Sequence, residues 1–254
     1  MAKKANNPFA RTLISNANMD PAQKFRIEEA YKSIRTNIML SILKKGCKTI
    51  VVSSGSPAEG KTTTTINLAI SIAQADQRVL LIDCDLRKPK MHHYFGVSNA
   101  PGLTNYISDS VKTTALRRTC TALFTEQNFP TIAAVRRFHS TNPAELLGSE
   151  PMAEFLLQIS RDYDYVIIDT PPLNVVSDAL PIIRESDGVV IVVRANGSTH
   201  PEVQKVMESL EFIDAKVLGF IYNFAEDKRS RYSRYKYGYD YGYGYGYGYD
   251  AGAE

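Results

Sequence analysis

A glycine-rich loop carries the most recognisable chemistry in this sequence. Residues 55–62 read Gly-Ser-Pro-Ala-Glu-Gly-Lys-Thr, a spacing that lets successive backbone N–H groups surround phosphate oxygens. The apolar run 48–54 before the loop predicts a buried strand, and the periodicity of 62–75 predicts a helix whose N-terminus adds positive dipole. We therefore predict an ATP site in which Lys61 reaches the β- and γ-phosphates and the Thr62 hydroxyl binds Mg²⁺. The loop residues assigned to this site are Gly55, Ser56, Pro57, Ala58, Glu59, Gly60, Lys61, Thr62 and Thr63.

Three aspartates follow apolar runs elsewhere in the chain. Asp83 and Asp85 come at the end of the run 78–83, and Asp169 ends the run 165–169. Ligands of parallel α/β sheets gather at the carboxyl ends of the strands, so these side chains are expected to face the same crevice as the glycine loop. An aspartate placed as Asp169 is suited to hold Mg²⁺ directly or through water. A strand-terminal turn with an Asx cap is the structural alternative for Asp83 and Asp85.

The elements that must position these groups form an alternating pattern. Apolar runs predict strands at 48–54, 78–83, 165–169, 188–194 and 216–222, and helical patterns fall at 21–43, 62–75, 145–161, 178–185 and 201–213. Residues 101–140 are less regular, with one helix and a strand at 129–135 expected. Continuous apolar strands alternating with helices predict an α/β, three-layer P-loop NTPase fold, with a mostly parallel central sheet and helices on both faces.

Composition supports one domain with two appendages. The chain has 254 residues, 44% of them hydrophobic, which is enough for one full-sized core. We predict a flexible arm at 1–20, a P-loop domain at 21–225 and a basic, Tyr/Gly-rich, disordered tail at 226–254. The net charge of +3 is too small to indicate nucleic acid as a partner. The three cysteines are odd in number and widely spaced, which suits a reducing compartment, and no His or Cys spacing indicates zinc.

The sequence lacks an apolar stretch of the roughly 18 to 20 residues that a membrane span needs, and no apolar signal core follows the first residues. We therefore expect a cytoplasmic protein; if it works at a membrane, another molecule must hold it there.

Several segments together resemble the bacterial tyrosine kinases of capsule and exopolysaccharide synthesis. They are the glycine loop with its preceding serine (54–62), Leu-Ile-Asp-x-Asp-x-Arg-x-Pro (81–89), Asn-Pro-Ala-Glu-Leu-Leu (142–147) and Ile-Ile-Asp-Thr-Pro-Pro (167–172). The resemblance implies that Lys61 and Thr62 handle ATP and Mg²⁺. It also implies that Asp83 activates the acceptor tyrosine, and that Asp85 and Asp169 organise the metal. Arg87 is assigned to the nucleotide site as well, and Asn223 resembles an adenine-contacting position.

A partitioning or cell-division positioning ATPase is the alternative. Those proteins carry a second lysine immediately after the first glycine of the loop, where this chain has Ser56. In that alternative the protein is a binding switch whose tail only binds partners.

An N-terminal helix is expected to mediate self-association. Glu29, Lys32 and Arg35 lie three apart on one face, and the resemblance associates a Glu-x2-Arg-x2-Arg pattern there with a ring-shaped homo-oligomer. Lys32 keeps the charge of the first arginine but lacks its bidentate fork. A solvated helix face with local ion pairs is the structural alternative.

The tail is expected to be the substrate. Nine of the 15 tyrosines are the predicted phosphoacceptors, at Tyr232, Tyr235, Tyr237, Tyr239, Tyr241, Tyr243, Tyr245, Tyr247 and Tyr249. Glycine keeps such a segment flexible, and tethering raises its effective concentration at a neighbouring active site. The structural alternative is an adhesive low-complexity segment, and the basic cluster 228–236 could bind anionic lipid or simply solubilise the tail. The resemblance further implies a separate membrane-embedded activator and a cognate tyrosine phosphatase as partners.

Overall fold

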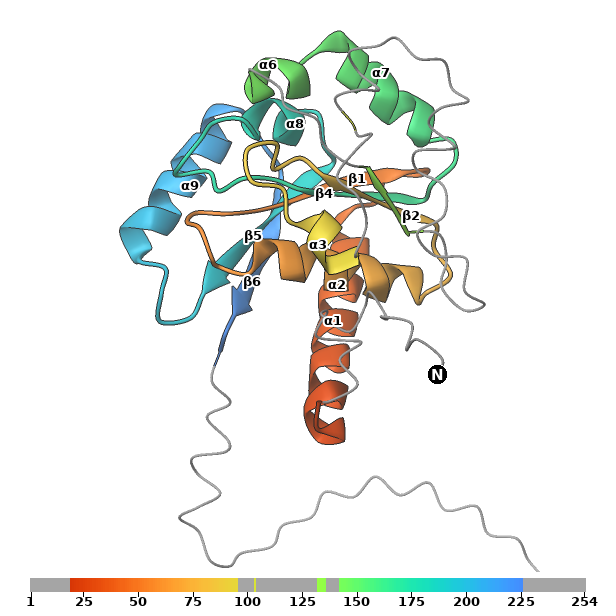
Figure 1. The fold of residues 1–254 in the computed structure, drawn as a ribbon, viewed down its shortest axis with the longest axis vertical. Helices are drawn as coiled ribbons and strands as arrows, with labels where there is room; N and C mark the ends of the chain where they lie inside the picture. The colour runs from red at the N-terminus through yellow and green to blue at the C-terminus, as the bar shows by residue number, and fades with distance from the viewer. Residues whose placement is uncertain (1–18, 96–102, 104–131, 136–141, 226–254) are drawn as a thin grey trace, which may run out of the picture. The chain divides into compact units, whose positions relative to one another are not determined.

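The computed structural model describes residues 19–95, 103, 132–135 and 142–225 (Figure 1). Apart from Leu103 and one strand, the segment 101–140 lies outside the described residues. So do most of the predicted arm and the whole tail from residue 226, including its nine tyrosines. Among the described residues, no helix is both long and apolar enough to cross a bilayer.

A six-stranded sheet forms the centre of the fold, and every pairing in it is parallel. Its strands lie in the order β3-β2-β4-β1-β5-β6. They are β1 (Lys48–Ser54), β2 (Val79–Asp83), β3 (Ile132–Val135), β4 (Tyr165–Asp169), β5 (Gly188–Arg194) and β6 (Val217–Asn223). The α/β prediction is confirmed, and β1, β4 and β5 have the predicted bounds.

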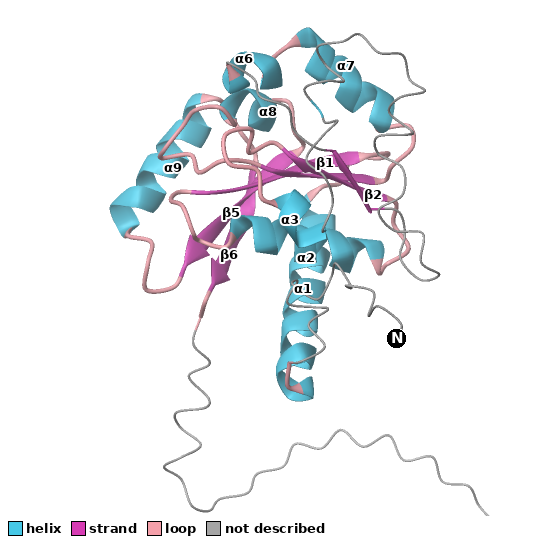
Figure 2. Ribbon diagram, viewed as in Figure 1, coloured by secondary structure: helices cyan, strands magenta, loops and turns pink. Residues whose placement is uncertain are grey.

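Helices cover both faces of the sheet (Figure 2). One face carries α1 (Pro21–Ser41), α2 (Lys61–Ala73) and α3 (Met91–Phe95). The other carries α6 (Pro143–Leu147), α7 (Glu150–Ile159), α8 (Leu180–Arg184) and α9 (His200–Phe212). Successive strand residues enter opposite cores: Ile50 and Val52 pack with the first group of helices, whereas Val51 packs with the second. The strands are therefore buried on both faces, which explains their continuous apolar sequences.

Two helices differ from their predictions. The helix predicted at 145–161 is two helices, because Gly148 ends α6 and the Ser149 side chain accepts a hydrogen bond from Met152 N–H to begin α7. The five-residue α3 was not predicted, since one turn is too short to show a period. The helix expected within 101–140 lies outside the described residues, and the other predicted elements are present with ends shifted by at most a few residues.

Candidate nucleotide and metal site

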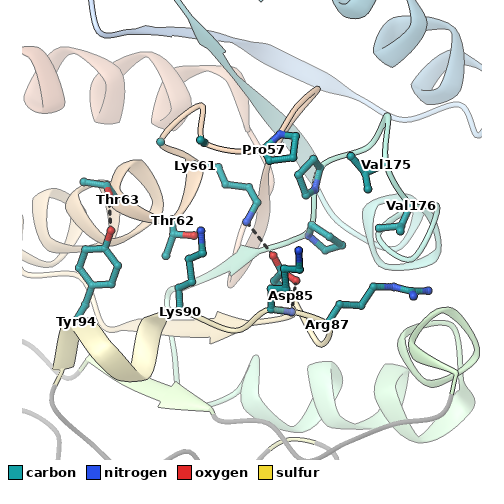
Figure 3. Close-up of a pocket in the computed structure, with 15 residues that line it drawn as sticks. Pro57, Lys61, Thr62, Thr63, Asp85, Arg87, Lys90, Tyr94, Val175 and Val176 are labelled. Carbon is teal, nitrogen blue, oxygen red and sulfur yellow. Dashed lines mark hydrogen bonds and ion pairs between the residues drawn. The ribbon is translucent and has the colours of Figure 1, made fainter. Parts of the chain in front are cut away.

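The glycine loop joins the end of the central strand β1 to the start of α2. Gly60 precedes the helix with φ +88°, a left-handed conformation that glycine adopts without strain. Ala58 has φ +63°, which is uncommon for a residue with a side chain. The loop borders a cavity of about 290 Å³ (Figure 3). The cavity is lined by Pro57, Ala58, Gly60, Lys61, Thr62, Thr63, Asp85, Arg87, Lys88, Lys90, Tyr94, Pro171, Pro172, Val175 and Val176.

The predicted lysine, threonine and carboxylates converge beside this cavity. Lys61 Nζ lies 3.3 Å from Asp85 Oδ2 and 3.7 Å from Asp169 Oδ2. The Thr62 hydroxyl donates to Asp169 Oδ2 at 2.6 Å. The sheet explains this convergence, because β2 and β4 are neighbours and Asp83 pairs in register with Asp169. Three segments far apart in the sequence thus meet at one edge of the sheet, although Asp85 is the one of the three aspartates that lines the cavity.

The charges in this cluster alter one another's protonation. Burial raises the pKa of Asp83 to about 7, and the neighbouring Asp169 carboxylate adds to the shift. Burial likewise raises the pKa of Asp169, although Lys61 opposes that shift. For Lys61, burial disfavours the ammonium, but Asp169 and Asp85 together outweigh burial and the lysine pKa is raised. The lysine is therefore held charged by the carboxylates that face it.

Asp83 and Asp85 occupy different positions. Asp85 lines the cavity, whereas Asp83 is 4% exposed and is not among the residues that line it. The Asp83 carboxylate accepts N–H groups from Asp85, Lys90 and Met91, each at 3.1 Å. Asp83 thus shapes the turn that carries Asp85. Its expected role as the base for the acceptor tyrosine stays a prediction.

The oxygen atoms at this site match the preferences of Mg²⁺. A small, hard cation takes carboxylate and hydroxyl oxygens and keeps several waters, and Thr62 Oγ1, Asp169 and Asp85 supply such groups within one cluster. No group of three or more His, Cys, Asp or Glu side chains is arranged to hold a metal ion by itself in the part of the chain that is described. Thr62, Asp85 and Asp169 therefore remain the proposed metal residues, with water and phosphate oxygens completing the coordination.

The other predicted nucleotide residues are placed as follows. Arg87 lines the cavity and pairs with Asp178, with Nη2 3.0 Å from Oδ1. Thr63 lines it too, and its hydroxyl lies 2.8 Å from the Tyr94 hydroxyl. Asn223 donates from Nδ2 to Glu59 O at 3.0 Å and accepts Phe224 N–H at 2.9 Å, so both ends of its amide bind the chain itself.

Several residues at the cavity were missed from the sequence. Lys88 and Lys90 follow the Asp83 motif, and their sign and position could have suggested a cationic rim. Val175 and Val176 form part of an apolar wall with the two prolines after Asp169 (Figure 3). Asp178 gives no sequence signal, because its partner Arg87 is 91 positions away.

The residues expected at a ring interface lie on α1. Lys32 Nζ is 2.7 Å from Glu29 Oε1, and both side chains are about half exposed. Arg35 instead donates from Nη1 to Ser71 O, near the end of α2, at 2.6 Å. Part of the predicted contact surface is thus engaged within the chain, and its role between subunits stays a prediction.

These features together define a P-loop nucleotide-binding protein. The sheet is parallel, a glycine loop follows its central strand, a lysine and a threonine begin the next helix, and acidic residues lie at the ends of adjacent strands. A family model described as "AAA domain" matches residues 47–218. Tyrosine-protein kinase YwqD of Bacillus subtilis is 36% identical over 209 residues, which are 82% of this chain and 85% of YwqD. Putative tyrosine-protein kinase CapB of Staphylococcus aureus is 34% identical over 242 residues, 92% of this chain and 98% of CapB. The chain belongs to the family of bacterial tyrosine kinases.

Solved structures agree with this assignment. The kinase domain of Escherichia coli tyrosine kinase ETK superposes with a TM-score of 0.74 at 29% identity, covering 96% of this chain and 87% of that domain. The septum site-determining protein MinD from Pyrococcus horikoshii, solved with Mg-ADP, has a TM-score of 0.55 at 21% identity over 69% of this chain and 70% of MinD, and shares the fold alone. Some relatives are longer: 82% of this chain matches tyrosine-protein kinase wzc of Salmonella typhimurium at 33% identity, but covers only 28% of wzc.

Proposed function

We propose that this chain is an ATP- and Mg²⁺-dependent protein-tyrosine kinase that phosphorylates the tyrosines of its own C-terminal tail between subunits. The observation that carries the proposal is one cluster of four side chains: Lys61, Thr62 and Asp85 line the cavity, and the buried Asp169 contacts Lys61 and Thr62. Phosphoryl transfer depends on positioned phosphates, a neutralising metal and an oriented nucleophile. The names of the relatives supply the acceptor class, which is protein tyrosine.

The side chains divide the work as their positions suggest. The loop N–H groups and Lys61 bind the β- and γ-phosphates, and Thr62, Asp85 and Asp169 hold the metal. Mg²⁺, when bound, supplies positive charge to the phosphate oxygens as the transfer proceeds. A phenol with a pKa near 10 is a poor nucleophile at neutral pH, and a carboxylate within reach that accepts its proton would activate it. We assign that role to Asp83, with Arg87 and Asn223 as further nucleotide residues.

The domain assignment follows from the same proposal. Residues 21–225 form the kinase domain, residues 1–20 an arm, and residues 226–254 the substrate tail that carries nine tyrosines. About 20 extended residues span at most roughly 60 to 70 Å, which is enough to reach a neighbouring subunit. The ring interface would use Glu29, Lys32 and Arg35.

We also propose that the kinase regulates capsular or extracellular polysaccharide synthesis and export from the inner face of the membrane. A separate membrane-embedded activator would recruit it, and a cognate tyrosine phosphatase would reset it.

The test maps phosphotyrosine on the full chain by mass spectrometry. The pure protein is incubated with ATP and Mg²⁺, and the same chain is also recovered from its own cells, where any activator is present. We expect phosphate on tail tyrosines in at least the second sample, and its loss in Lys61→Met. Lys205→Met, which removes an exposed lysine of α9, is the matched control and should retain phosphotyrosine.

An unphosphorylated tail in both samples would refute the kinase proposal. ATP hydrolysis by such a chain would support the alternative, an ATPase switch whose tail only binds partners.

A further inference from the structure

The connection between β5 and α9 contacts the glycine loop at several points. Ser198 donates its hydroxyl hydrogen to Glu59 Oε1. Arg194 Nη1 donates to Ala58 O at 3.3 Å, and the Ser56 hydroxyl donates to Glu202 Oε1 at 3.1 Å. Glu202 is itself fixed, because it forms a capping box with Thr199 at the start of α9. The outer half of the phosphate loop is therefore held by a segment about 140 residues away in sequence.

Glu59 is the centre of these contacts. It is 4% exposed, and both of its carboxylate oxygens are used: Oε2 accepts Ser56 N–H at 2.9 Å, and Oε1 accepts the Ser198 hydroxyl. Ser198 Oγ in turn accepts Arg194 N–H at 2.8 Å. The Glu59 carbonyl accepts Asn223 Nδ2. One side chain thus closes residues 56–59 into a turn and attaches that turn to the end of β5.

A carboxylate in a phosphate-binding loop needs a physical reason, because its charge repels the phosphates that the loop receives. The reason lies in the shape of the loop. Ala58 is held at φ +63°, and Gly60 at φ +88°, and such a backbone persists in a residue with a side chain only when surrounding contacts fix it. An anion that binds the Ser56 N–H from within the protein supplies such a contact before any nucleotide arrives.

We propose that Glu59 and Ser198 form a clamp that holds the phosphate loop in its nucleotide-binding shape, so that both are positioning residues. This inference depends on one part of the proposed function, namely that the loop binds the phosphate groups of a nucleotide. Without the clamp the loop samples other shapes, and the apparent dissociation constant rises by the inverse of the fraction still competent to bind. Groups that touch the γ-phosphate in the transition state are unchanged, so the loss falls on KM for ATP and not on kcat.

The test measures binding of ADP with Mg²⁺, and of inorganic tripolyphosphate by competition, to the full chain by calorimetry. We expect Ser198→Ala to raise both dissociation constants about 10-fold, which corresponds to a loop that is competent about one-tenth of the time. Hydrogen exchange of peptides covering residues 54–62 should be faster in the nucleotide-free variant. KM for ATP should rise by a similar factor, with kcat falling less than about threefold.

Two comparisons separate the clamp from general damage. Ser209→Ala removes a hydroxyl of α9 that is hydrogen-bonded to a backbone carbonyl, Lys205 O, and should leave ADP affinity unchanged. Ser198→Thr keeps a hydroxyl and should restore most of the binding. In a second pair, Glu59→Gln should recover most of the affinity that Glu59→Ala loses. The amide oxygen of Gln can accept Ser56 N–H, and its amide nitrogen can donate to Ser198 Oγ.

ADP and tripolyphosphate affinities within twofold of wild type in both Ser198→Ala and Glu59→Ala would overturn the proposal. An equal loss in Ser209→Ala would overturn it as well. The binding measurement needs no phosphoryl transfer. If the variants raise the dissociation constants as expected but the wild-type chain forms no phosphotyrosine, the kinase proposal is refuted and the clamp proposal stands.

Discussion

At the scale of single residues, alanine substitutions at Gly60 and Gly46 distinguish the cost of a strained backbone from the cost of a steric clash. Both have positive φ, +88° and +84°, but a Cβ on Gly60 would lie 2.1 Å from Asn223 Nδ2, whereas a Cβ on Gly46 meets nothing within 4 Å. Gly46→Ala should cost about 1 kcal/mol of unfolding free energy and leave ADP affinity intact. Gly60→Ala must also displace Asn223 from Glu59, so ADP affinity should fall more than about 10-fold. Calorimetric titration of both variants checks this, and equal affinities would contradict it.

Asp83 and Asp85 allow the proposed base to be distinguished from a metal residue. Asp83→Asn removes a proton acceptor, so kcat for tail phosphorylation should fall about 100-fold or more. The one amide oxygen of Asn can still accept the Lys90 and Met91 N–H groups, although the bond from Asp85 N–H is lost. Affinity for ADP with Mg²⁺ should therefore change less than about threefold. Asp85→Asn should instead weaken metal-dependent ADP binding, since Asp85 faces Lys61 and the cavity.

Single-turnover rates and ADP titrations, each with and without Mg²⁺, separate the two variants. A parallel loss of rate and affinity in Asp83→Asn would assign Asp83 to shaping the turn and not to proton transfer.

The predictable part of the site is the part that local sequence encodes. The glycine loop and the aspartates at strand ends carry their geometry in a few consecutive residues, so their convergence follows once the strands are parallel. Ser198 and Asp178 could not be found in this way. Each acts through one hydrogen-bonded contact with a residue more than 90 positions away, and a lone serine or aspartate in a loop has no pattern of its own.

At the scale of elements, burial decided which bounds could be predicted. The strands β1, β4 and β5 have apolar, buried centres, so their ends lie within two residues of the ends of apolar runs. One helix was predicted at 145–161, but the structure has two. Gly148 and Ser149 followed by Pro151 are typical of one helix ending and another beginning. Helix α3 has five residues, fewer than two turns, and no periodicity can reveal it.

The attachment of α1 to α2 gives a prediction about stability. Arg35 Nη1 donates to Ser71 O at 2.6 Å in a half-buried position, whereas the Lys32–Glu29 pair is exposed. Arg35→Ala should lower the free energy of unfolding by about 1 to 2 kcal/mol, and Lys32→Ala by less than about 0.5 kcal/mol. Urea unfolding of the full chain measures both. Equal values would mean that the bond to α2 contributes nothing to the folded state.

At the scale of the whole molecule, we expect the charge of the tail to affect self-association. Five cationic residues lie between Lys228 and Lys236, directly before the tyrosine cluster. Each phosphate adds about 1.5 to 2 negative charges at neutral pH, so a few modified tyrosines outweigh the positive charge of these five residues. We expect this repulsion to loosen the proposed homo-oligomer. Sedimentation velocity of dephosphorylated and fully phosphorylated protein tests it, and identical profiles would contradict it.

The bond between Arg35 and Ser71 also has a mechanical consequence. Helix α2 has 13 residues and is therefore a rod of about 20 Å, with the phosphate loop at its N-terminus and the Arg35 bond near its C-terminus. A helix this short bends little. A shift of α1 against the sheet would therefore be transmitted through α2 to its N-terminus, where Lys61 lies. The proposed subunit surface on α1 and the proposed phosphate-binding amine of Lys61 are thus connected through one short helix.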